Sequence, residues 1–336
     1  LIRQLYQKDL SIAGITRMQD DANVYNMIQK ADTVGVFQIE SRAQMSMLPR
    51  LRPACYYDLV IQIAIVRPGP IQGDMVHPFL KRRNGEEPIS YPSEAVKEVL
   101  SRTLGVPIFQ EQVIKLAMVA AGFTGGEADQ LRRAMAKWKK DGELFKFKSK
   151  LIKGMESRGY ETTFAERIFE QICGFGEYGF PESHSASFAV LAYTSAWLKY
   201  YYPEVFYSAL LNSLPMGFYS ASQLIQDARR HGVVVLPVCI NNSQYQHSMV
   251  KDNQSYALRL GFRIVKGLSE ASVDTLVAFR PKGGFTDISE LKSSNVCRRD
   301  IELLASADAL KVLSGNRYSA RWSIMNAETE LPLFRN

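Results

Sequence analysis

The sequence predicts a mainly α protein, in which a large multi-helical domain is followed by a small α-rich domain with a few short strands. Apolar residues recur at helical spacing through most of the chain, and Gly, Pro or short polar segments separate the helical stretches. Near Pro215 the helical stretches become shorter and two short β-like runs enter. The 336 residues suffice for two or three domains with buried cores.

The larger domain is expected to follow a polar connector without a strong apolar period, which we place at residues 1–30. Residues 34–39 predict a short strand or a buried turn. The apolar run 56–66 ends at Arg67-Pro68-Gly69-Pro70, which continues neither a helix nor a central strand. Helices are predicted over residues 93–101, 111–121, 127–138, 144–158, 164–173, 185–200 and 203–213.

The smaller domain is expected to mix short helices with strands. Residues 222–230 predict a helix, and residues 233–236 and 256–262 predict strands. The polar stretch 241–254 between the strands predicts a loop. Further helices are predicted over residues 270–279, 288–292, 298–305 and 319–326.

Positive charge is concentrated in one segment of the chain. Residues 132–153 contain nine Lys or Arg and two acids, so they carry a net charge of +7, which equals the formal net charge of the whole chain. The remaining residues therefore sum to zero. A concentrated basic segment favours a polyanionic partner. A solvated basic helix is the alternative, because most charge runs are solvated faces.

The start of this basic segment has the pattern of a helix. Asp129 stands in the expected first turn, where acids are favourable. Leu131 and Met135 are four residues apart and predict one buried stripe. Arg132 and Arg133 therefore project from a fixed helix, and guanidinium groups match phosphate oxygens in bidentate fashion. The two arginines are candidate phosphate ligands.

The cysteines and histidines predict no metal site. The four cysteines form no CxxC pair, which favours a reducing compartment, and the four histidines have no ligand spacing. The chain starts with Leu1 and shows no leader, so we expect a fragment of a longer cytoplasmic protein. The uncharged stretch 183–198 is too short to span a bilayer, and we expect no membrane partner.

A glycine-rich loop precedes the long helix predicted over residues 185–200, which is expected to be buried. Residues 174–179 fit GxGxxG, but a dinucleotide site needs a strand before the glycines, and a helix is predicted there. The loop leads into Ser183-His184-Ser185, where the N–H groups of a helix N-terminus can bind phosphate. Ser183 or Ser185 equally fits a simple N-cap. His184 is a candidate phosphate or base contact.

A second candidate nucleic-acid contact lies in the smaller domain. Residues 264–270 resemble the hairpin of a helix-hairpin-helix DNA module, whose backbone N–H groups hold a phosphate. Lys266 and Gly267 are its candidate DNA contacts, and Ser269 stands where a second glycine is usual. A degenerate second copy lies at residues 303–310. There Asp308 would repel phosphate, and a purely structural helical pair is an equal alternative.

Five sequence blocks occur in the same order in bacterial C-family DNA polymerases, a family that includes the DNA polymerase III alpha subunit. They are residues 35–42 (GVFQIESR), 67–70 (RPGP), 109–113 (FQEQV), 131–135 (LRRAM) and 179–185 (GFPESHS). Five ordered blocks are more specific than any single motif. The chain resembles this family along nearly its whole length.

The resemblance implies a division of the chain. Residues 31–215 would form the polymerase fingers domain, and residues 255–326 the helix-hairpin-helix DNA-binding domain. Residues 216–254 would link the two domains. Residues 1–30 would connect to a missing palm domain, and residues 327–336 would lead to a missing C-terminal domain.

The resemblance also implies roles for individual residues. The nucleotide-binding residues would be Arg132, Arg133, Tyr178 and His184. The DNA-binding residues would be Lys137, Lys139, Lys140, Lys266 and Gly267. The family's three catalytic carboxylates, which hold Mg²⁺, belong to the palm, so this chain would contain no catalytic residue and no metal ligand. It is expected to be inactive alone, while the full-length enzyme would add deoxynucleotides to a primer.

Within the family, the chain most resembles the error-prone, damage-inducible branch. Pro181-Glu182 stands where replicative enzymes usually carry Asn-Lys. Residues 71–78 are similar to the error-prone branch. The branch implies translesion synthesis with a DNA primer-template, deoxynucleoside triphosphates and accessory damage-response proteins. A replicative alpha subunit and a non-catalytic DNA-binding scaffold are the alternatives. Phe109 replaces a usual Tyr, so any hydroxyl contact there is lost.

The end of the chain contains a short apolar peptide. Glu330-Leu331-Pro332-Leu333-Phe334 resembles the Gln-Leu-x-Leu-Phe peptide that docks bacterial polymerases on the sliding clamp. Glu330 replaces the usual Gln and lacks its amide donors. We favour an interdomain linker for this peptide, with docking on the sliding clamp as the alternative.

Overall fold

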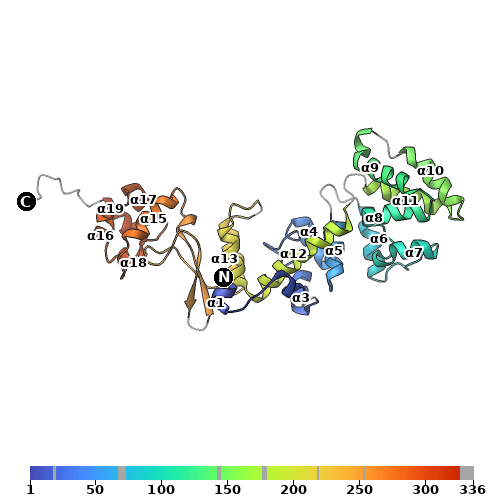
Figure 1. Ribbon diagram of the computed structural model, residues 1–336. Helices are drawn as coiled ribbons and strands as arrows, with labels where there is room; N and C mark the ends of the chain where they lie inside the picture. The colour runs from blue at the N-terminus through green and yellow to red at the C-terminus, as the bar shows by residue number, and fades with distance from the viewer. Residues whose placement is uncertain are drawn as a thin grey trace, which may run out of the picture. The chain divides into compact units, whose positions relative to one another are not determined.

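A computed structural model describes residues 1–17, 20–66, 73–141, 145–175, 180–217, 219–252 and 255–325, with the side chains of residues 73–77, 136–141, 145 and 174–175 left aside (Figure 1). The chain divides into two compact units. The N-terminal unit is Asp9–Tyr200, and the C-terminal unit combines Leu1–Lys8 with Tyr201–Asn336. Helices predominate in both units, so the mainly α fold class is confirmed.

The N-terminal unit is built from helices. They are α2 (Ile12–Arg17), α3 (Ala22–Gln29), α4 (Arg42–Leu51), α5 (Tyr56–Ile65), α6 (Gly73–Arg83), α7 (Glu94–Leu100), the short 3₁₀ helix η1 (Ser101–Thr103), α8 (Gln110–Val119), α9 (Gly125–Asp141), α10 (Phe145–Glu156), α11 (Thr162–Phe175) and α12 (Glu182–Tyr201). None of the helices described in either unit combines the length and apolarity that a bilayer span requires.

Helices α7 to α11 share one hydrophobic core. Leu131 and Met135 of α9 are each 1% exposed within it, which confirms the buried stripe expected from their spacing. Gly154 lets α10 approach the end of α8 closely, because a Cβ at this position would lie 2.2 Å from the carbonyl oxygen of Ala121. The basic helices α9 and α10 are therefore fixed on a packed base.

Helix α12 packs on α5 and on the turn at residues 33–39. The Ser185 hydroxyl is buried and donates to the carbonyl of Val60 in α5 at 2.5 Å. Lys199 is fully buried, and its ammonium group lies 2.9 Å from the Asp32 carboxylate. Val36, in the turn, is also fully buried. The buried turn, rather than a strand, is the structure of this segment.

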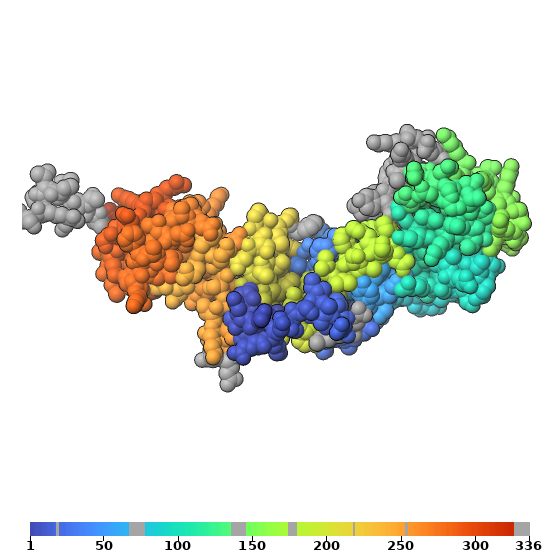
Figure 2. Space-filling view, in the orientation of Figure 1, coloured from blue at the N-terminus to red at the C-terminus, as the bar shows by residue number. Residues whose placement is uncertain are grey.

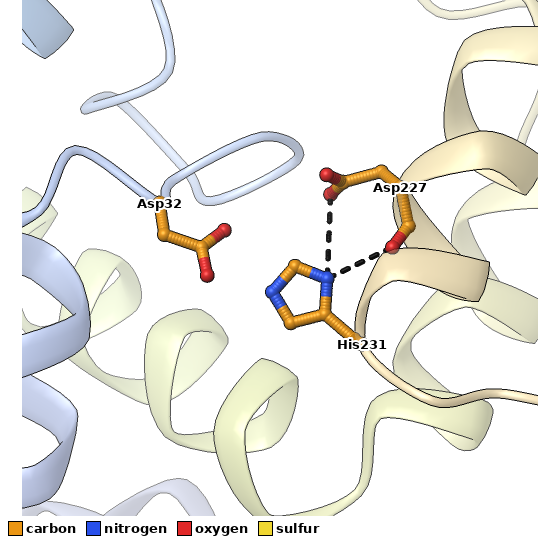
Figure 3. Close-up of side chains that lie close together, drawn as sticks. All are labelled: Asp32, Asp227 and His231. Atoms are coloured by element: carbon orange, nitrogen blue, oxygen red, sulfur yellow. Dashed lines mark hydrogen bonds and ion pairs between the residues drawn. The ribbon is translucent and has the colours of Figure 1, made fainter.

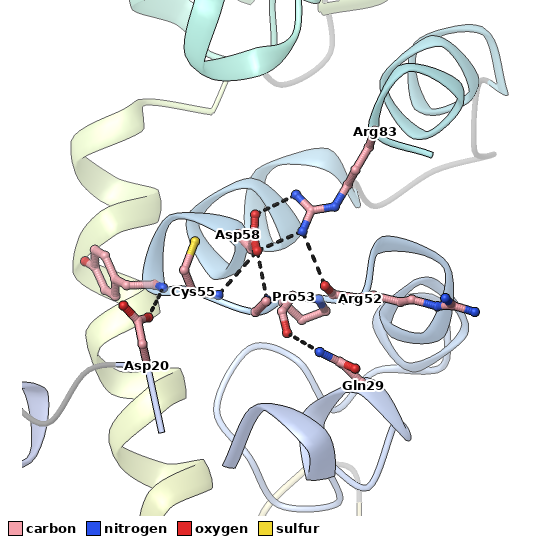
Figure 4. Close-up of polar contacts among 9 residues, drawn as sticks. Asp20, Gln29, Arg52, Pro53, Cys55, Asp58 and Arg83 are labelled. Carbon is pink, nitrogen blue, oxygen red and sulfur yellow. Dashed lines mark hydrogen bonds and ion pairs between the residues drawn. The ribbon is translucent and has the colours of Figure 1, made fainter. Parts of the chain in front are cut away.

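A partly buried ion pair ties α5 to α6 (Figure 4). The Arg83 guanidinium donates to both oxygens of Asp58, at 2.6 and 2.8 Å, and to the carbonyl of Arg52 at 3.3 Å. The same carboxylate accepts from the backbone N–H groups of Ala54 and Cys55. Burial opposes ionisation of Asp58, but the hydrogen bonds and charge of Arg83 outweigh it, so the pKa of Asp58 is lowered.

The C-terminal unit combines helices with one small sheet. Its elements are α1 (Ile2–Tyr6), α13 (Pro203–Asn212), α14 (Ala221–Arg230), β1 (Val235–Leu236), β2 (Ser248–Asp252), β3 (Ser255–Arg259), the 3₁₀ helix η2 (Phe262–Ile264), α15 (Glu270–Phe279), α16 (Ile288–Ser293), α17 (Arg298–Ser306), α18 (Lys311–Ser314) and α19 (Arg317–Met325). The strand order is β1-β3-β2, with β1 parallel and β2 antiparallel to β3. Helices α15 to α19 pack together as the orange-to-red body in Figure 2.

Two expectations from the sequence are wrong. Residues 241–254 were expected to form a loop, but β2 lies among them and pairs with β3 along its length. Only Met249 and Val250 of its five residues are apolar, and Lys251 and Asp252 are exposed, so the strand has a weak apolar signal. Residues 1–30 were expected to lack apolar periodicity, but α3 buries Val24 and Ile28, which are fully shielded. Asp21 caps that helix by accepting from Asn23 and Val24 N–H groups.

Candidate nucleotide and DNA interface

The N-terminus of α9 is held by a reciprocal cap. The Thr124 hydroxyl accepts from the N–H of Glu127 at 3.4 Å, and the Glu127 carboxylate accepts from the N–H of Thr124 at 3.0 Å. Lys150 of α10 pairs with the same carboxylate, and this bond is the largest cause of the lowered pKa of Glu127. The cap and the ion pair fix the helix that carries the candidate arginines.

Arg132 and Arg133 lie about two turns after Thr124, and they share one carboxylate. Arg132 Nε and Nη2 lie 3.0 and 2.9 Å from Asp129 Oδ1, and Arg133 Nε lies 2.8 Å from Oδ2. The side chains of Arg132 and Arg133 are 43% and 72% exposed. The hydrogen bond from Arg132 is the largest cause of the lowered pKa of Asp129.

This arrangement can bind an oxyanion. The Asp129 carboxylate, held by two guanidinium groups, has the charge and oxygen geometry that a phosphate would present to them. The sequence pattern identified both arginines but missed their shared partner. Asp129 lies three residues before Arg132 and four before Arg133, and this helical spacing is the signal that could have revealed the ion pairs.

Further cations of the basic segment are presented by α10. Its four lysines, which are Lys146, Lys148, Lys150 and Lys153, are all exposed. Lys148 lies 5.6 Å from the Phe169 ring centroid and Lys150 lies 5.4 Å from that of Phe123. The side chains of the three predicted DNA-binding lysines of α9 lie outside the described residues; these are Lys137, Lys139 and Lys140.

The first turn of α12 presents His184 within an aromatic group. Its ring centroid lies 4.2 Å from that of Phe188 and 5.4 Å from that of Phe180, and His184 itself is exposed. The ring centroid of Phe188 also lies 5.3 Å from that of Phe37. Tyr178, the other predicted pocket residue, lies outside the described residues. His184 thus offers a ring edge to solvent on an apolar support.

The serines beside His184 have structural positions. The helix begins at Glu182, so Ser183 and Ser185 lie inside its first turn and the N-cap interpretation is wrong for both. Ser185 is buried and donates to a carbonyl, as described above, so it faces no phosphate. The predicted role of His184 does not depend on either serine.

Glu182 joins three distant segments at the start of α12. The Tyr57 hydroxyl donates to its carboxylate at 2.9 Å, and Arg102 lies 3.2 Å from the same oxygen. The Arg102 guanidinium also stacks 3.8 Å from the Tyr57 ring centroid. Burial, followed by the bond to Glu182, raises the pKa of Tyr57. Sequence reasoning missed Tyr57 and Arg102, because no local pattern joins positions so far apart.

Helix α8 connects the α12 start to α9. Phe109, fully buried before α8, forms a bridge with Phe180, and the N–H of Gln110 donates to the Phe180 carbonyl. The burial of Phe109 leaves its ring without access to a ligand. Among the described residues, no hydrogen bond, ion pair or ring contact joins Arg132 or Arg133 to His184. Both groups are instead fixed to the same helix, α8.

The predicted hairpin in the C-terminal unit has the backbone of a tight turn. Gly267 has φ of +90°, which a residue with a side chain rarely adopts, and the N–H of Leu268 donates to Val265. Lys266 and Gly267 are both exposed. Ser269 has extended backbone and caps α15 by accepting from the N–H of Ser272. The usual second glycine is therefore not required by this backbone.

The degenerate second copy contains a comparable turn. Asp308 has φ of +60°, and α18 begins three residues later at Lys311, just as α15 begins three residues after Gly267. Ala309 is fully buried and its carbonyl accepts from the N–H of Ile240. These contacts anchor the turn in the core.

Neither unit, within the residues the structure describes, brings three metal-ligating side chains of its own together. In the C-terminal unit, His231 Nδ1 lies 4.0 Å from the Asp227 carboxylate and 2.8 Å from the Asp227 carbonyl oxygen (Figure 3). The Tyr207 hydroxyl donates to the same carboxylate at 2.5 Å. These residues form a hydrogen-bond network within the C-terminal unit.

Comparison with known proteins assigns both units. Residues 1–159 match the bacterial DNA polymerase III alpha subunit finger domain, and residues 232–320 match a helix-hairpin-helix motif. The chain belongs to this polymerase family. It is 74% identical over its whole length to an error-prone DNA polymerase of Vibrio parahaemolyticus, and 60% identical to one of Idiomarina loihiensis. The chain spans about a third of the length of these curated relatives, 33% and 32%.

Proposed function

We propose that the chain is the fingers and DNA-binding part of an error-prone DNA-directed DNA polymerase. The observation that carries the proposal is the identity of 74% over the whole chain with a protein named error-prone DNA polymerase. The relative from Vibrio vulnificus, 71% identical over 99% of the chain, bears the same name. These names favour the error-prone branch over a replicative alpha subunit. Residues 31–215 are the proposed fingers, and residues 255–326 the proposed DNA-binding domain.

In this proposal, Arg132 and Arg133 bind the triphosphate of the incoming deoxynucleotide. They exchange the Asp129 carboxylate for phosphate oxygens, and their charge stabilises the phosphates during transfer. His184, with Tyr178, shapes the pocket for the base pair. The Mg²⁺ that the full-length enzyme would require is proposed to be held by palm carboxylates outside this chain, as the resemblance to the polymerase family implies.

The C-terminal unit is proposed to hold the primer-template through Lys266 and the backbone at Gly267. Both are exposed at a tight turn, as a phosphate contact requires. Accessory damage-response proteins and a cytoplasmic location belong to the same proposal. The Glu330–Phe334 peptide lies outside the described residues, and we retain the linker interpretation for it, with clamp docking as the alternative.

The proposal is tested in the full-length protein by single-turnover incorporation of one deoxynucleotide. Arg132→Ala or Arg133→Ala removes a charge-assisted contact of about 1.5–3 kcal/mol. If this contact is felt in the transition state, the incorporation rate falls roughly 10- to 100-fold. Lys153→Ala is the matched control, because it removes an exposed cation of the same basic segment from α10.

The expected pattern is slow incorporation by the arginine variants with little change in DNA affinity, and normal incorporation by the Lys153 variant. Wild-type incorporation combined with a collapse of DNA binding would make the arginines duplex contacts. A full-length protein with no template-dependent extension under any condition would favour the non-catalytic scaffold.

A further inference from the structure

Helix α19 presents an exposed aromatic face at the end of the described chain. Tyr318, Trp322 and Met325 are 74%, 67% and 66% exposed, which is more than any other large apolar side chain that the structure describes. With about 100° of rotation per residue, the three side chains lie within an arc of about 60°. Ala320 and Ile324, which are buried, occupy the opposite side of the helix. The helix therefore buries one apolar face in the core and exposes a second face of large apolar side chains.

The helix is held rigidly at both ends. At its start, the Asn316 side chain accepts from the N–H groups of Tyr318 and Ser319, at 2.9 and 3.0 Å. At its end, the Lys292 ammonium group donates to the carbonyls of Ser323 and Ile324, at 3.0 and 3.2 Å. The exposed rings are thus mounted on a fixed support rather than on a loose terminus.

The charged residues of the segment that carries this face have one sign. Residues 311–325 contain Lys311, Arg317 and Arg321 and no acid. The Arg317 guanidinium lies 5.4 Å from the Tyr318 ring centroid. A symmetric contact between two copies of this face would bring like charges together, which is unfavourable. Aromatic rings interleaved with arginines instead match the bases and phosphates of a single nucleic-acid strand.

We propose that the α19 face is a stacking platform for single-stranded DNA, with bases on Tyr318 and Trp322 and phosphates on Arg317 and Arg321. The choice of DNA as the ligand rests on the proposed polymerase function, in which an unpaired template strand is present. The platform is distinct from the hairpin at Lys266, which is proposed to contact duplex DNA.

The test measures binding of a labelled oligothymidylate to the full 336-residue chain by fluorescence anisotropy, without nucleotide or primer extension. Trp322→Ala is expected to weaken binding roughly 5- to 150-fold, as expected for about 1–3 kcal/mol per stacked base. Trp322→Phe retains a ring and should keep most of the affinity. Phe279→Ala is the matched control, because Phe279 is a 51% exposed aromatic residue of the same unit that lies at the end of α15, outside the α19 face.

A blunt duplex gives the second arm of the experiment. Its affinity should be unchanged by Trp322→Ala and lowered by Lys266→Ala. Equal affinity of Trp322→Ala and wild type for oligothymidylate would overturn the platform, as would an equal loss for the duplex. Loss of self-association in Trp322→Ala, seen by sedimentation without a change in DNA affinity, would instead assign the face to a second copy. None of these readouts uses nucleotide incorporation, so the platform can fail while the polymerase proposal stands, and the reverse.

Discussion

Two turns of the C-terminal unit have similar backbones and different surroundings. Gly267 and Asp308 both have positive φ, and each stands three residues before a helix. The first turn exposes Lys266 beside a residue without a side chain. The second places a carboxylate at the corresponding position and buries Ala309 behind it. From this comparison we infer that turn geometry alone does not make a phosphate site, and that the charge and exposure of the flanking residues favour the first turn.

The two turns also differ in how they are supported. Before the first turn, the N–H of Gly261 donates to Nδ1 of the buried His247 at 3.0 Å. Backbone hydrogen bonds support the second turn, including the one from Ile240 to Ala309. The support of the first turn therefore contains a titratable group, whereas the backbone bonds that support the second do not titrate.

The largest expected effect is a pH-dependent loss of this support. Burial, followed by the charge of Arg263, lowers the pKa of His247 from 6.5 to about 4. Because the folded-state pKa lies below the unfolded value, the contribution to stability is complete above pH 6.5 and is lost as the pH falls towards 4. The unfolding free energy should drop by roughly 3 kcal/mol over this range. Denaturant titration at several pH values measures it.

His247→Gln provides the control for that titration. The Gln side chain keeps an acceptor for the Gly261 N–H but does not titrate. Its unfolding free energy should be nearly constant between pH 6.5 and 4 once other groups are accounted for. If the variant and the wild type lose stability in parallel, another group is responsible.

The next effect concerns the backbone of the first turn. Gly267→Ala forces a Cβ into a left-handed conformation and should lower the unfolding free energy by roughly 1–2 kcal/mol. Gly283→Ala is the matched control, because Gly283 lacks a positive φ and has open space around its Cα. Chemical denaturation of both variants measures the difference. Equal stability of the two variants would show that the turn relaxes without cost.

A smaller effect is expected from the exposed lysine of the first turn. Lys266→Ala should remove one phosphate contact and reduce the slope of log affinity against log salt concentration by about 0.9 for duplex DNA. Lys282→Ala removes another exposed cation of the same unit and should leave the slope nearly unchanged. A slope that falls equally in both variants would indicate a diffuse electrostatic effect rather than a contact at the hairpin.

The smallest effect is expected at the second turn. Asp308→Asn removes the negative charge while keeping a residue that tolerates the left-handed region. Duplex affinity should rise less than about tenfold, because the backbone at Ala309 stays buried and hydrogen-bonded to Ile240. Measurement at two salt concentrations separates loss of repulsion from a new contact. A rise comparable with the loss in Lys266→Ala would show that the acid alone had excluded DNA from this turn.

The sequence predicted the long helices well because their signals are local. Helix α15 was predicted with its observed bounds, and Leu131 and Met135 were correctly assigned to the buried face of α9. Strand β2 was missed because its stability comes from pairing with β3 rather than from its own residues. Arg132 and Arg133 became candidates through the local concentration of basic residues and their helical spacing, and their role stays a prediction. The Tyr57–Arg102–Glu182 cluster was not predicted, since it joins residues up to 125 positions apart.

The ion pair between Asp58 and Arg83 constrains which substitutions these positions accept during evolution. Loss of either partner leaves a partly buried charge uncompensated, whereas joint replacement by apolar residues of similar volume is often neutral. Single substitutions at these two positions should therefore be removed by selection, and tolerated changes should arrive in pairs. Positions 58 and 83, which lie in different helices, are expected to vary together among related polymerases.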